Sequence, residues 1–415
     1  MTDHIAQAGP RRAAFVFIFI TVLLDMLALG TIIPVLPKLV VSFLHGDTAG
    51  AAEVYGVFGT AWALMQFLCS PLLGALSDRF GRRPVVLISN LGLGLDYIVM
   101  AVAPSLAWLF VGRVVSGITS ASISVGFAYV ADVTPPDGRA ARFGMLGVAF
   151  GVGFVLGPAL GGLAGGVDPR LPFWIAAGLS LANALYGFFI LPESLARERR
   201  APFEWRRANP LGALALLRSQ RHLFGLAGVY FLGQLAHAIL PSLTVLYMGY
   251  RYGWDERMVG LVMAGVGVCS MVVQGTLIGP VVKRFGERRA LIAGLVFGAA
   301  GFATYAIAAN GLVFLAGIPL LALWGFANPS TLGLMSRRVG PQEQGQVQGA
   351  NASMAGIANL IGPGLFTQVF AAAIATDRAV PFPGAPFGLA AAMLVAAIAI
   401  AWRVTREDER IVSSE

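Results

Sequence analysis

Charged residues are scarce in this chain: they make up 12% of its 415 residues, whereas hydrophobic residues make up 57%. A soluble globular protein carries about 25% charged residues, so the composition excludes that class. Cysteine is rarer still, because Cys69 and Cys269 are the only two and both lie inside apolar runs. With no CxxC pair and no Cys/His cluster, we expect buried structural thiols, no disulfide framework, no metal site and no cofactor.

Long apolar runs are abundant and predict membrane helices. A run such as residues 13–33 is too long for the alternating ten-residue strands of a membrane barrel. It is also too long for the hydrophobic region of a signal peptide, so we expect this span to stay in the mature protein. The predicted fold class is an all-α membrane protein with twelve transmembrane helices. The expected spans are roughly 13–36, 54–76, 84–103, 106–131, 143–165, 172–191, 222–247, 258–281, 289–309, 311–335, 347–374 and 385–402.

Basic residues indicate the orientation of these spans. If the N-terminus is cytoplasmic, 23 of the 29 basic residues fall in inner segments, 5 in outer loops and one, Arg113, in a span. Since cytoplasmic loops carry the excess of Lys and Arg, both termini are expected in the cytoplasm. The formal charge of +8 then reflects topology and not nucleic-acid binding. Arginine greatly outnumbers lysine, and Ala and Gly are abundant, which is typical of proteins from GC-rich bacterial genomes. We therefore expect the protein to lie in a bacterial inner membrane.

A long polar segment divides the chain into two similar halves. We expect a six-helix half at 1–191, a cytoplasmic linker at 192–220 with a short interfacial helix from Asn209 to Arg218, and a second six-helix half with a cytoplasmic tail at 221–415. The halves repeat at an offset of 205 residues: Gly74 to Arg83 recurs as Gly279 to Arg288, and Gly157-Pro158 recurs as Gly362-Pro363. Two motifs at one offset predict pseudo-symmetric parallel halves.

The first motif joins spans two and three and consists of Gly74, Asp78, Arg79, Gly81, Arg82 and Arg83. Arginine in such a loop needs no explanation beyond topology, but the aspartate does. The ordered string resembles the loop signature of the major facilitator superfamily. The resemblance implies a cytoplasmic gate in which Asp78 docks near a helix beginning around Gly345, while Arg79 or Arg82 pairs with Asp132. Arg142 is assigned to the same gate, and Lys283 replaces the aspartate in the second copy.

The second motif is a stripe of small residues in span five, formed by Gly147, Gly151, Gly153, Gly157, Pro158, Gly161 and Gly162. Small residues at intervals of four let another helix approach closely, and close packing alone explains the stripe. The pattern also resembles the antiporter signature of drug/proton exchangers in the same superfamily. That resemblance favours export over import.

The third signal is acidic. Asp25, followed by Gly30 and Pro34, resembles the first-span motif of twelve-span drug/proton antiporters. A carboxylate inside an apolar helix is costly to keep charged and is readily neutralised, so it can carry a proton or meet a cationic substrate. At about 1.5 Å per residue, Asp25, Asp96 and Arg113 reach a similar depth. Arg113 is expected to pair with one of the acids, in a purely structural ion pair or a functional one, or with an anionic substrate.

The residues around Asp96 and Arg113 resemble the tetracycline/proton antiporters in particular. The resemblance implies that Asp25, Asp96 and Arg113 serve proton coupling. The C-terminal half departs from the pattern: Ser270 and Gly298 stand where tetracycline pumps carry a histidine and an acid, so tetracycline itself is not implied.

The C-terminal half offers polar and aromatic residues instead. They could hydrogen-bond and stack on an aromatic substrate, or simply hold helices together, and His237 could equally be a packed neutral imidazole. The substrate-binding candidates are Gln234, His237, Gln274, Trp324, Asn328 and Asn351.

The sequence and its resemblance therefore predict a secondary transporter that exports amphipathic drug-like molecules in exchange for protons, by alternating access. It is expected to be similar to the tetracycline resistance pumps. The alternative is a proton-coupled uptake symporter or facilitator of organic anions, with Arg113 as the anion site. The sequence contains no GxxxxGK segment, which would indicate that ATP drives transport. It also contains no HExxH or GxSxG motif, which would indicate an enzyme. The expected partners are the substrate, protons and the lipid bilayer, with no nucleic acid, and we expect a monomer.

Overall fold

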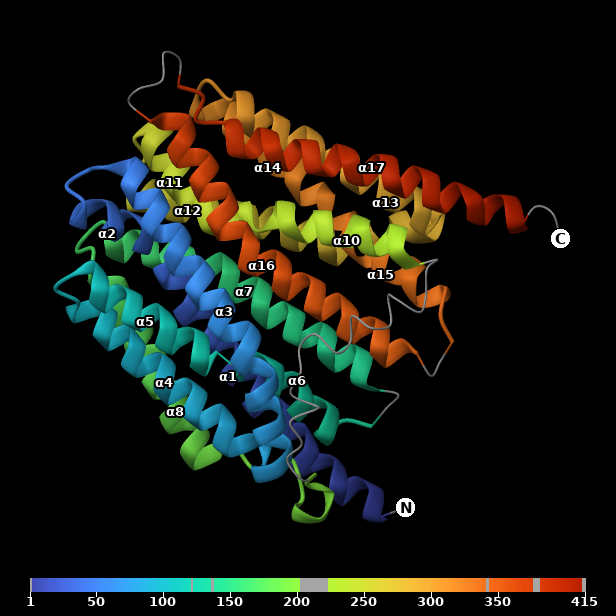
Figure 1. The fold of residues 1–415 in the computed structure, drawn as a ribbon. Coiled ribbons are helices and arrows are strands. Elements are labelled where there is room, and N and C mark those ends of the chain that lie inside the picture. Colours follow the sequence, from blue (N-terminus) through green and yellow to red (C-terminus); the bar gives the residue numbers. More distant parts are fainter. Residues whose placement is uncertain are drawn as a thin grey trace. The chain divides into compact units, whose positions relative to one another are not determined.

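The computed structural model describes residues 2–120, 122–135, 138–201, 223–340, 343–375 and 381–412. In these ranges every regular element is a helix (Figure 1). The expected interfacial helix from Asn209 to Arg218 lies outside the described residues.

The first half of the sequence forms α1 (Thr2–Ile32), α2 (Leu36–Phe43), α3 (Thr48–Phe80), α4 (Arg82–Val102), α5 (Leu106–Thr119), α6 (Ser122–Val133), α7 (Arg139–Gly165) and α8 (Leu171–Ile190). A short helix, η2 (Arg197–Arg199), follows. The second half forms α10 (Phe224–His237), α11 (Ile239–Tyr252), α12 (Glu256–Val272), the π-helical turn η5 (Val273–Leu277), α13 (Ile278–Ile307), α14 (Gly311–Leu323), the 3-10 turn η6 (Trp324–Phe326), α15 (Ala327–Arg337), α16 (Gln344–Ile374) and α17 (Ala385–Val412).

These helices confirm the predicted all-α membrane class. Within the described residues, 11 helical segments are long and apolar enough to cross a membrane. One of them, Glu256–Ile307, has 52 residues, more than twice the roughly 20 that a single crossing needs. Gly286 interrupts that segment with a non-helical φ of 79°. Because the segment holds two spans, twelve crossings are accounted for.

Local chemistry sets several helix ends. The side chain of Asn310 accepts a hydrogen bond from the backbone N–H of Val313 at 3.0 Å, which satisfies a free donor at the start of α14. Asp255 does the same for Met258 at the start of α12, at 2.8 Å. Gly253 ends α11 with a left-handed φ of 65°, a conformation that glycine adopts without strain.

The sequence repeat is also visible in the backbone. Gly81 and Gly286, 205 residues apart, both have positive φ, at 110° and 79°. The break between α1 and α2 recurs between α10 and α11 at Ala238, and the break after α5 at Ser120 recurs as η6. The two halves therefore share their interruptions as well as their motifs.

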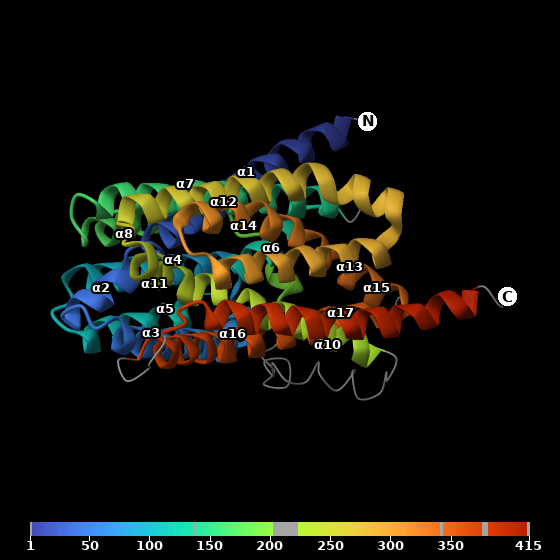
Figure 2. The same ribbon diagram turned by 90° about the horizontal axis from the view of Figure 1, so that it is seen from above.

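Neighbouring segments group into two compact units. Unit 1 comprises Met1–His45, Ala61–Asn209 and Trp254–Gly267, and unit 2 comprises Gly46–Thr60, Pro210–Gly253 and Val268–Glu415. In unit 1, α1 packs on α7 and α8, and α4 packs on α5, α6 and α8. In unit 2, α17 packs on both α10 and α13 (Figure 2).

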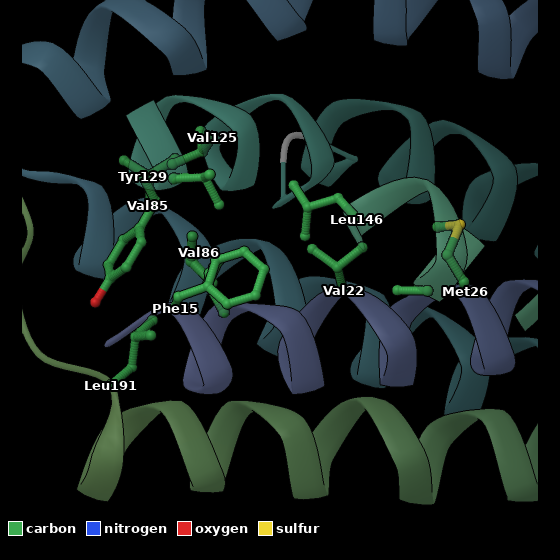
Figure 3. Packing of buried hydrophobic residues seen from close by; sticks show 12 residues of the cluster. Phe15, Val22, Met26, Val85, Val86, Val125, Tyr129, Leu146 and Leu191 are labelled. Carbon is green, nitrogen blue, oxygen red and sulfur yellow. The ribbon is translucent and has the colours of Figure 1, made fainter. Parts of the chain in front are cut away.

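A hydrophobic core holds the helices of unit 1 together around α1. Val22 and Met26 of α1 face Leu146 of α7, while Val86 of α4 and Tyr129 of α6 pack beside them (Figure 3). The ring of Tyr129 is fully buried, yet its hydroxyl reaches the backbone carbonyl of Pro192 at 2.9 Å. The core thus fixes α1, which carries Asp25, against three other helices.

Glycines bring α7 unusually close to α1. A Cβ atom at Gly157 would lie 2.7 Å from the Cα of Gly30, and one at Gly30 would lie 2.9 Å from the Cα of Gly157. Gly153 and Gly161 make similar approaches to Met26 and Thr31. Any side chain at these positions would force the two helices apart.

We therefore expect Gly157→Ala to lower the free energy of unfolding by about 1–3 kcal/mol, the usual cost of overpacking a tight contact. Gly147→Ala is the matched control, since nothing lies within 4 Å of a Cβ atom at Gly147 on the same helix. Thermal unfolding of the detergent-purified variants measures both effects. Equal melting temperatures for the two variants would contradict the packing described above.

Candidate functional site

Three of the predicted residues lie deep inside unit 1. Asp25 on α1 is 4% exposed, Asp96 on α4 is 1% exposed and Arg113 on α5 is 9% exposed. All three act electrostatically on the hydroxyl of Tyr97, so they share one polar neighbourhood. The structure therefore brings together two acids and one base that are separated by up to 88 positions in the sequence.

Two buried amides hold the Asp25 carboxylate. The side-chain nitrogen of Asn183 on α8 donates to Asp25 Oδ1 at 2.8 Å and to the backbone carbonyl of Thr21 at 2.9 Å. With the Asn90 amide turned so that its nitrogen faces the carboxylate, that nitrogen lies 3.1 Å from Asp25 Oδ1 and 3.3 Å from Oδ2. Asn90 and Asn183 are both fully buried. Sequence reasoning missed them, although each is a polar residue inside an apolar span.

Asp96 and Arg113 form the other side of this site. Arg113 acts electrostatically on the Asp96 carboxylate, but neither oxygen of that carboxylate has a hydrogen-bond partner among the described residues. The Arg113 guanidinium lies 5.3 Å from the ring centre of Trp62. Gly112 leaves room for the carboxylate, because a Cβ atom there would lie 2.5 Å from Asp96 Oδ1. Arg113 thus has an aromatic face and the charge of a nearby acid to stabilise its buried cation.

A small cavity lies beside Asp25 and Trp62. Its volume is ≈ 20 Å³, which leaves room for about one water molecule. The walls combine polar and apolar side chains. They are formed by Asp25, Met26, Leu29, Trp62, Leu93, Tyr97, Ser116, Ser120 and Ile123.

A second polar network lies at the turn between α3 and α4. Arg82 forms ion pairs with Asp78 at 2.5 Å and with Asp132 at 3.1 Å, and it donates to Ser77 at 2.6 Å. Ser194 also donates to Asp132, at 3.1 Å. Of the two arginines expected to reach Asp132, the structure thus places Arg82 there. A cavity of ≈ 340 Å³ opens beside Asp78 and Arg82.

The other predicted residues of this network contact aromatic rings or backbone. Arg79 lies 5.2 Å from the ring centre of Phe80, and Arg142 lies 4.2 Å from that of Phe15. Arg83 donates to the backbone carbonyl of Phe188. In the described residues, Arg142 is therefore placed against α1.

Glu193 completes this turn and was missed by the sequence analysis. Its carboxylate accepts hydrogen bonds from the backbone N–H of Arg82 at 2.8 Å and of Arg83 at 3.3 Å, and so caps the start of α4. A Cβ atom at Gly81 would collide with this carboxylate, and Gly81 has a positive φ. The motif thus needs Gly81 for two independent reasons.

Unit 2 repeats three charges of this network with opposite sign, whereas Arg79 and Arg83 recur as Arg284 and Arg288. At the 205-residue offset, Lys283 takes the place of Asp78, Glu287 that of Arg82 and Arg337 that of Asp132. Glu287 and Arg337 form an ion pair at 2.9 Å, as Arg82 and Asp132 do in unit 1. The sequence analysis noted Lys283 alone, because the third position lies outside the motif.

The glycine motif has a second contact face in unit 1. A Cβ atom at Gly162 would lie 2.8 Å from the Cα of Gly260 on α12, so these two helices also meet through glycines. Beside this contact, Lys38 donates to the backbone carbonyl of Trp254 at 2.6 Å and pairs with Glu256 at 3.5 Å. Lys38 was interpreted from the sequence only as part of an outer loop.

Unit 2 contains all six substrate-binding candidates. The ring of His237 lies 5.8 Å from that of Trp324, and both have exposed surface. Gln274 lies in the π-helical turn η5 next to Gly325, while Gln234 donates to the hydroxyl of Tyr230 at 2.9 Å. Asn328 is exposed on α15. These candidates are therefore brought together only in part.

Asn351 and Gly298 add two observations on the same unit. The Asn351 side chain is 3% exposed, and neither its oxygen nor its nitrogen has a hydrogen-bond partner among the described residues. A Cβ atom at Gly298 would lie 2.7 Å from the Trp324 ring, so the tryptophan occupies the space that an acid would need there.

Comparisons with known proteins identify relatives over most of the chain. The family model described as Major Facilitator Superfamily matches residues 18–363. The chain is 41% identical over 363 residues to the Tetracycline resistance protein, class C, of Escherichia coli, covering 88% of this chain and 91% of that protein. It is 36% identical over 359 residues to the class D protein of Salmonella ordonez, covering 86% and 90%. Among solved structures, the human organic anion transporter MFSD10 (TETRAN) matches with a TM-score of 0.70 and 26% identity, covering 94% of this chain and 99% of that chain.

The charge reversal between the units gives a stability prediction. Arg82→Glu places a carboxylate against Asp78 and Asp132 and should lower the free energy of unfolding by roughly 1–3 kcal/mol, less than for a fully buried pair because the Asp78 side chain is 46% exposed. The triple variant Asp78→Lys, Arg82→Glu, Asp132→Arg copies the charges of unit 2 and should recover most of this loss.

Thermal unfolding of purified protein measures both variants. Arg79→Glu is the control, since it makes the same change of charge in the same turn at an exposed residue. A triple variant no more stable than Arg82→Glu would show that the paired charges do not stabilise this turn.

Proposed function

Because the chain belongs to the Major Facilitator Superfamily, we propose that it exports drug-like molecules of the tetracycline type in exchange for protons. The family makes the protein a transporter and not an enzyme. The similarity to tetracycline resistance proteins supports the class of substrate. The observation that carries the proposal is the buried cluster of Asp25, Asp96 and Arg113 in a bundle of membrane-spanning helices.

Proton coupling follows from the chemistry of this cluster. A carboxylate is costly to keep charged in an apolar bundle, so protonation and deprotonation of Asp25 or Asp96 changes the balance of charge around Arg113. The cavity next to Asp25 has room for about one water, which can deliver a proton. We therefore assign proton binding to the two acids, and control of their charge to Arg113. No cofactor other than the transported proton enters this mechanism.

Conformational control is assigned to the two contact networks. Asp78, Arg82 and Asp132 form the proposed cytoplasmic gate, because the basic residues place the α3–α4 turn on that side. The close contacts of α7 with α1 and α12 are assigned to the helix packing that alternating access requires. Both termini are proposed to be cytoplasmic and the membrane to be the inner membrane of a bacterium.

Substrate binding is assigned to residues of unit 2. His237 and Trp324 offer an aromatic pair with exposed surface, and Asn351 offers a buried amide whose hydrogen-bonding capacity is unused. An aromatic, polar molecule would satisfy both features. Because Trp324 packs against Gly298, the proposal is for a wider range of amphipathic molecules than tetracycline alone. We propose that a monomer suffices.

The test is export into inverted membrane vesicles. With tetracycline and a panel of amphipathic drugs, an imposed proton gradient should drive uptake into vesicles that contain the wild-type protein. Asp25→Asn should reduce this uptake to the level of vesicles without the protein, because the variant cannot exchange its proton.

The control is Asp168→Asn, which changes an exposed acid outside the helices and should leave uptake unchanged. Undiminished uptake with Asp25→Asn would overturn the assignment of Asp25. Accumulation of organic anions by whole cells, abolished by collapsing the gradient, would instead favour an uptake symporter with Arg113 as its anion site.

A further inference from the structure

We propose that Asn183, together with Asn90, couples the charge of Asp25 to the packing of α1 against α8 and α4. This inference rests on the proposed function, because it concerns the acid that we assign to proton binding. It adds two positioning residues, neither of which is an acid or a base, to the site.

Asn183 connects α8 to the part of α1 that carries Asp25. Asn183 makes two hydrogen bonds to α1, one to the Asp25 carboxylate at 2.8 Å and one to the backbone carbonyl of Thr21 at 2.9 Å. Thr21 lies one turn before Asp25, so a single amide group on α8 spans the turn of α1 that carries the acid. The amide therefore fixes the direction of the carboxylate relative to its own helix.

A third helix, α4, also contributes a side chain to the Asp25 carboxylate. With the Asn90 amide on α4 turned as described above, its nitrogen lies 3.1 and 3.3 Å from the two oxygens of the same carboxylate. The carbonyl oxygen of Asn90 lies 3.1 Å from the side-chain nitrogen of Asn183, so the two amides also contact each other. Three helices thus meet at one carboxylate through groups that cannot titrate.

The strength of these hydrogen bonds depends on the charge of Asp25. Hydrogen bonds to an ionised carboxylate are roughly twice as strong as those between neutral groups. When Asp25 takes up a proton, the bonds from Asn183 and Asn90 weaken together, and one oxygen becomes a donor facing amide donors. Protonation therefore loosens the contacts of α1 with α8 and α4 at the same time. The charged groups that act on this region are Asp96 and Arg113, with Tyr97 as a further titratable neighbour.

The two acids of the site therefore differ in their surroundings. The Asp96 carboxylate has no hydrogen-bond partner among the described residues, whereas two amides on neighbouring helices hold Asp25. A change of charge at Asp25 is accordingly transmitted to helix contacts. An amide at position 183 is needed for that transmission even though it neither binds the proton nor contacts the cavity.

The experiment compares Asn183→Ala with Ser180→Ala. Ser180 is fully buried one turn earlier on α8, and its hydroxyl makes no hydrogen bond among the described residues, which makes it a matched control. Two readouts separate coupling from general damage: proton-driven uptake of tetracycline into inverted vesicles, and exchange of labelled tetracycline across the membrane without a gradient.

We expect Asn183→Ala to lower proton-driven uptake by about tenfold or more, as when a hydrogen bond to a charged group is lost, while exchange is retained. Ser180→Ala should leave both near the wild-type level. Equal uptake by the two variants, or equal loss of uptake and exchange with Asn183→Ala, would overturn the inference.

Infrared spectroscopy of the purified protein tests the contact without any substrate. The carboxylate band that disappears in Asp25→Asn should shift in Asn183→Ala and stay in place in Ser180→Ala. An unshifted band would overturn the inference even if transport were impaired. If Asn183→Ala does not fold, Asn90→Ala and Asn183→Ser, which keeps a donor, take its place with the same expected order. A wild-type protein that exports no compound would refute the proposed function, while the infrared band would still test the contact.

Discussion

A charge buried in an apolar bundle must find its partners inside the protein, and the structure of unit 1 depends on this constraint. Arg113 can be held within a membrane span because Asp96 and the ring of Trp62 lie beside it. Asp25 is held by Asn183 and Asn90. Each of these contacts joins different helices, so α1, α3, α4, α5 and α8 converge on one depth. The constraint that makes the site costly also specifies how these helices are arranged.

The repeat between the halves shows which parts of the architecture tolerate change. Backbone features are kept: Gly81 and Gly286 both have positive φ, and the helix breaks recur at the same offset. The signs of the paired charges are not kept, since the ion pair of Arg82 and Asp132 becomes Glu287 and Arg337. An ion pair is preserved when both of its charges change sign together. A left-handed turn, by contrast, favours glycine because glycine adopts a positive φ without strain.

Most of the architecture could be predicted from the sequence, because apolar runs and basic loops report directly on the bilayer. The helical class, the repeat and the buried positions of Asp25, Asp96 and Arg113 follow from such signals. Contacts between distant segments do not. Asn183 lies 158 positions from Asp25 and is one of several polar residues in apolar spans, so nothing in its local sequence marks it as a partner. Glu193 was hidden for a similar reason, since it lies in a linker that carries many other charged residues.

The side chain of Lys38 has a consequence for studying motion in this protein. It is one of two lysines in the chain, and its amine is engaged by Glu256 and by the carbonyl of Trp254. An amine that donates to two acceptors is a poor nucleophile, and it becomes reactive when those contacts are broken. The rate at which an acylating reagent modifies this one lysine therefore reports how often α2 separates from the start of α12. Lys38 is therefore a native chemical probe of that movement, so no engineered label is needed.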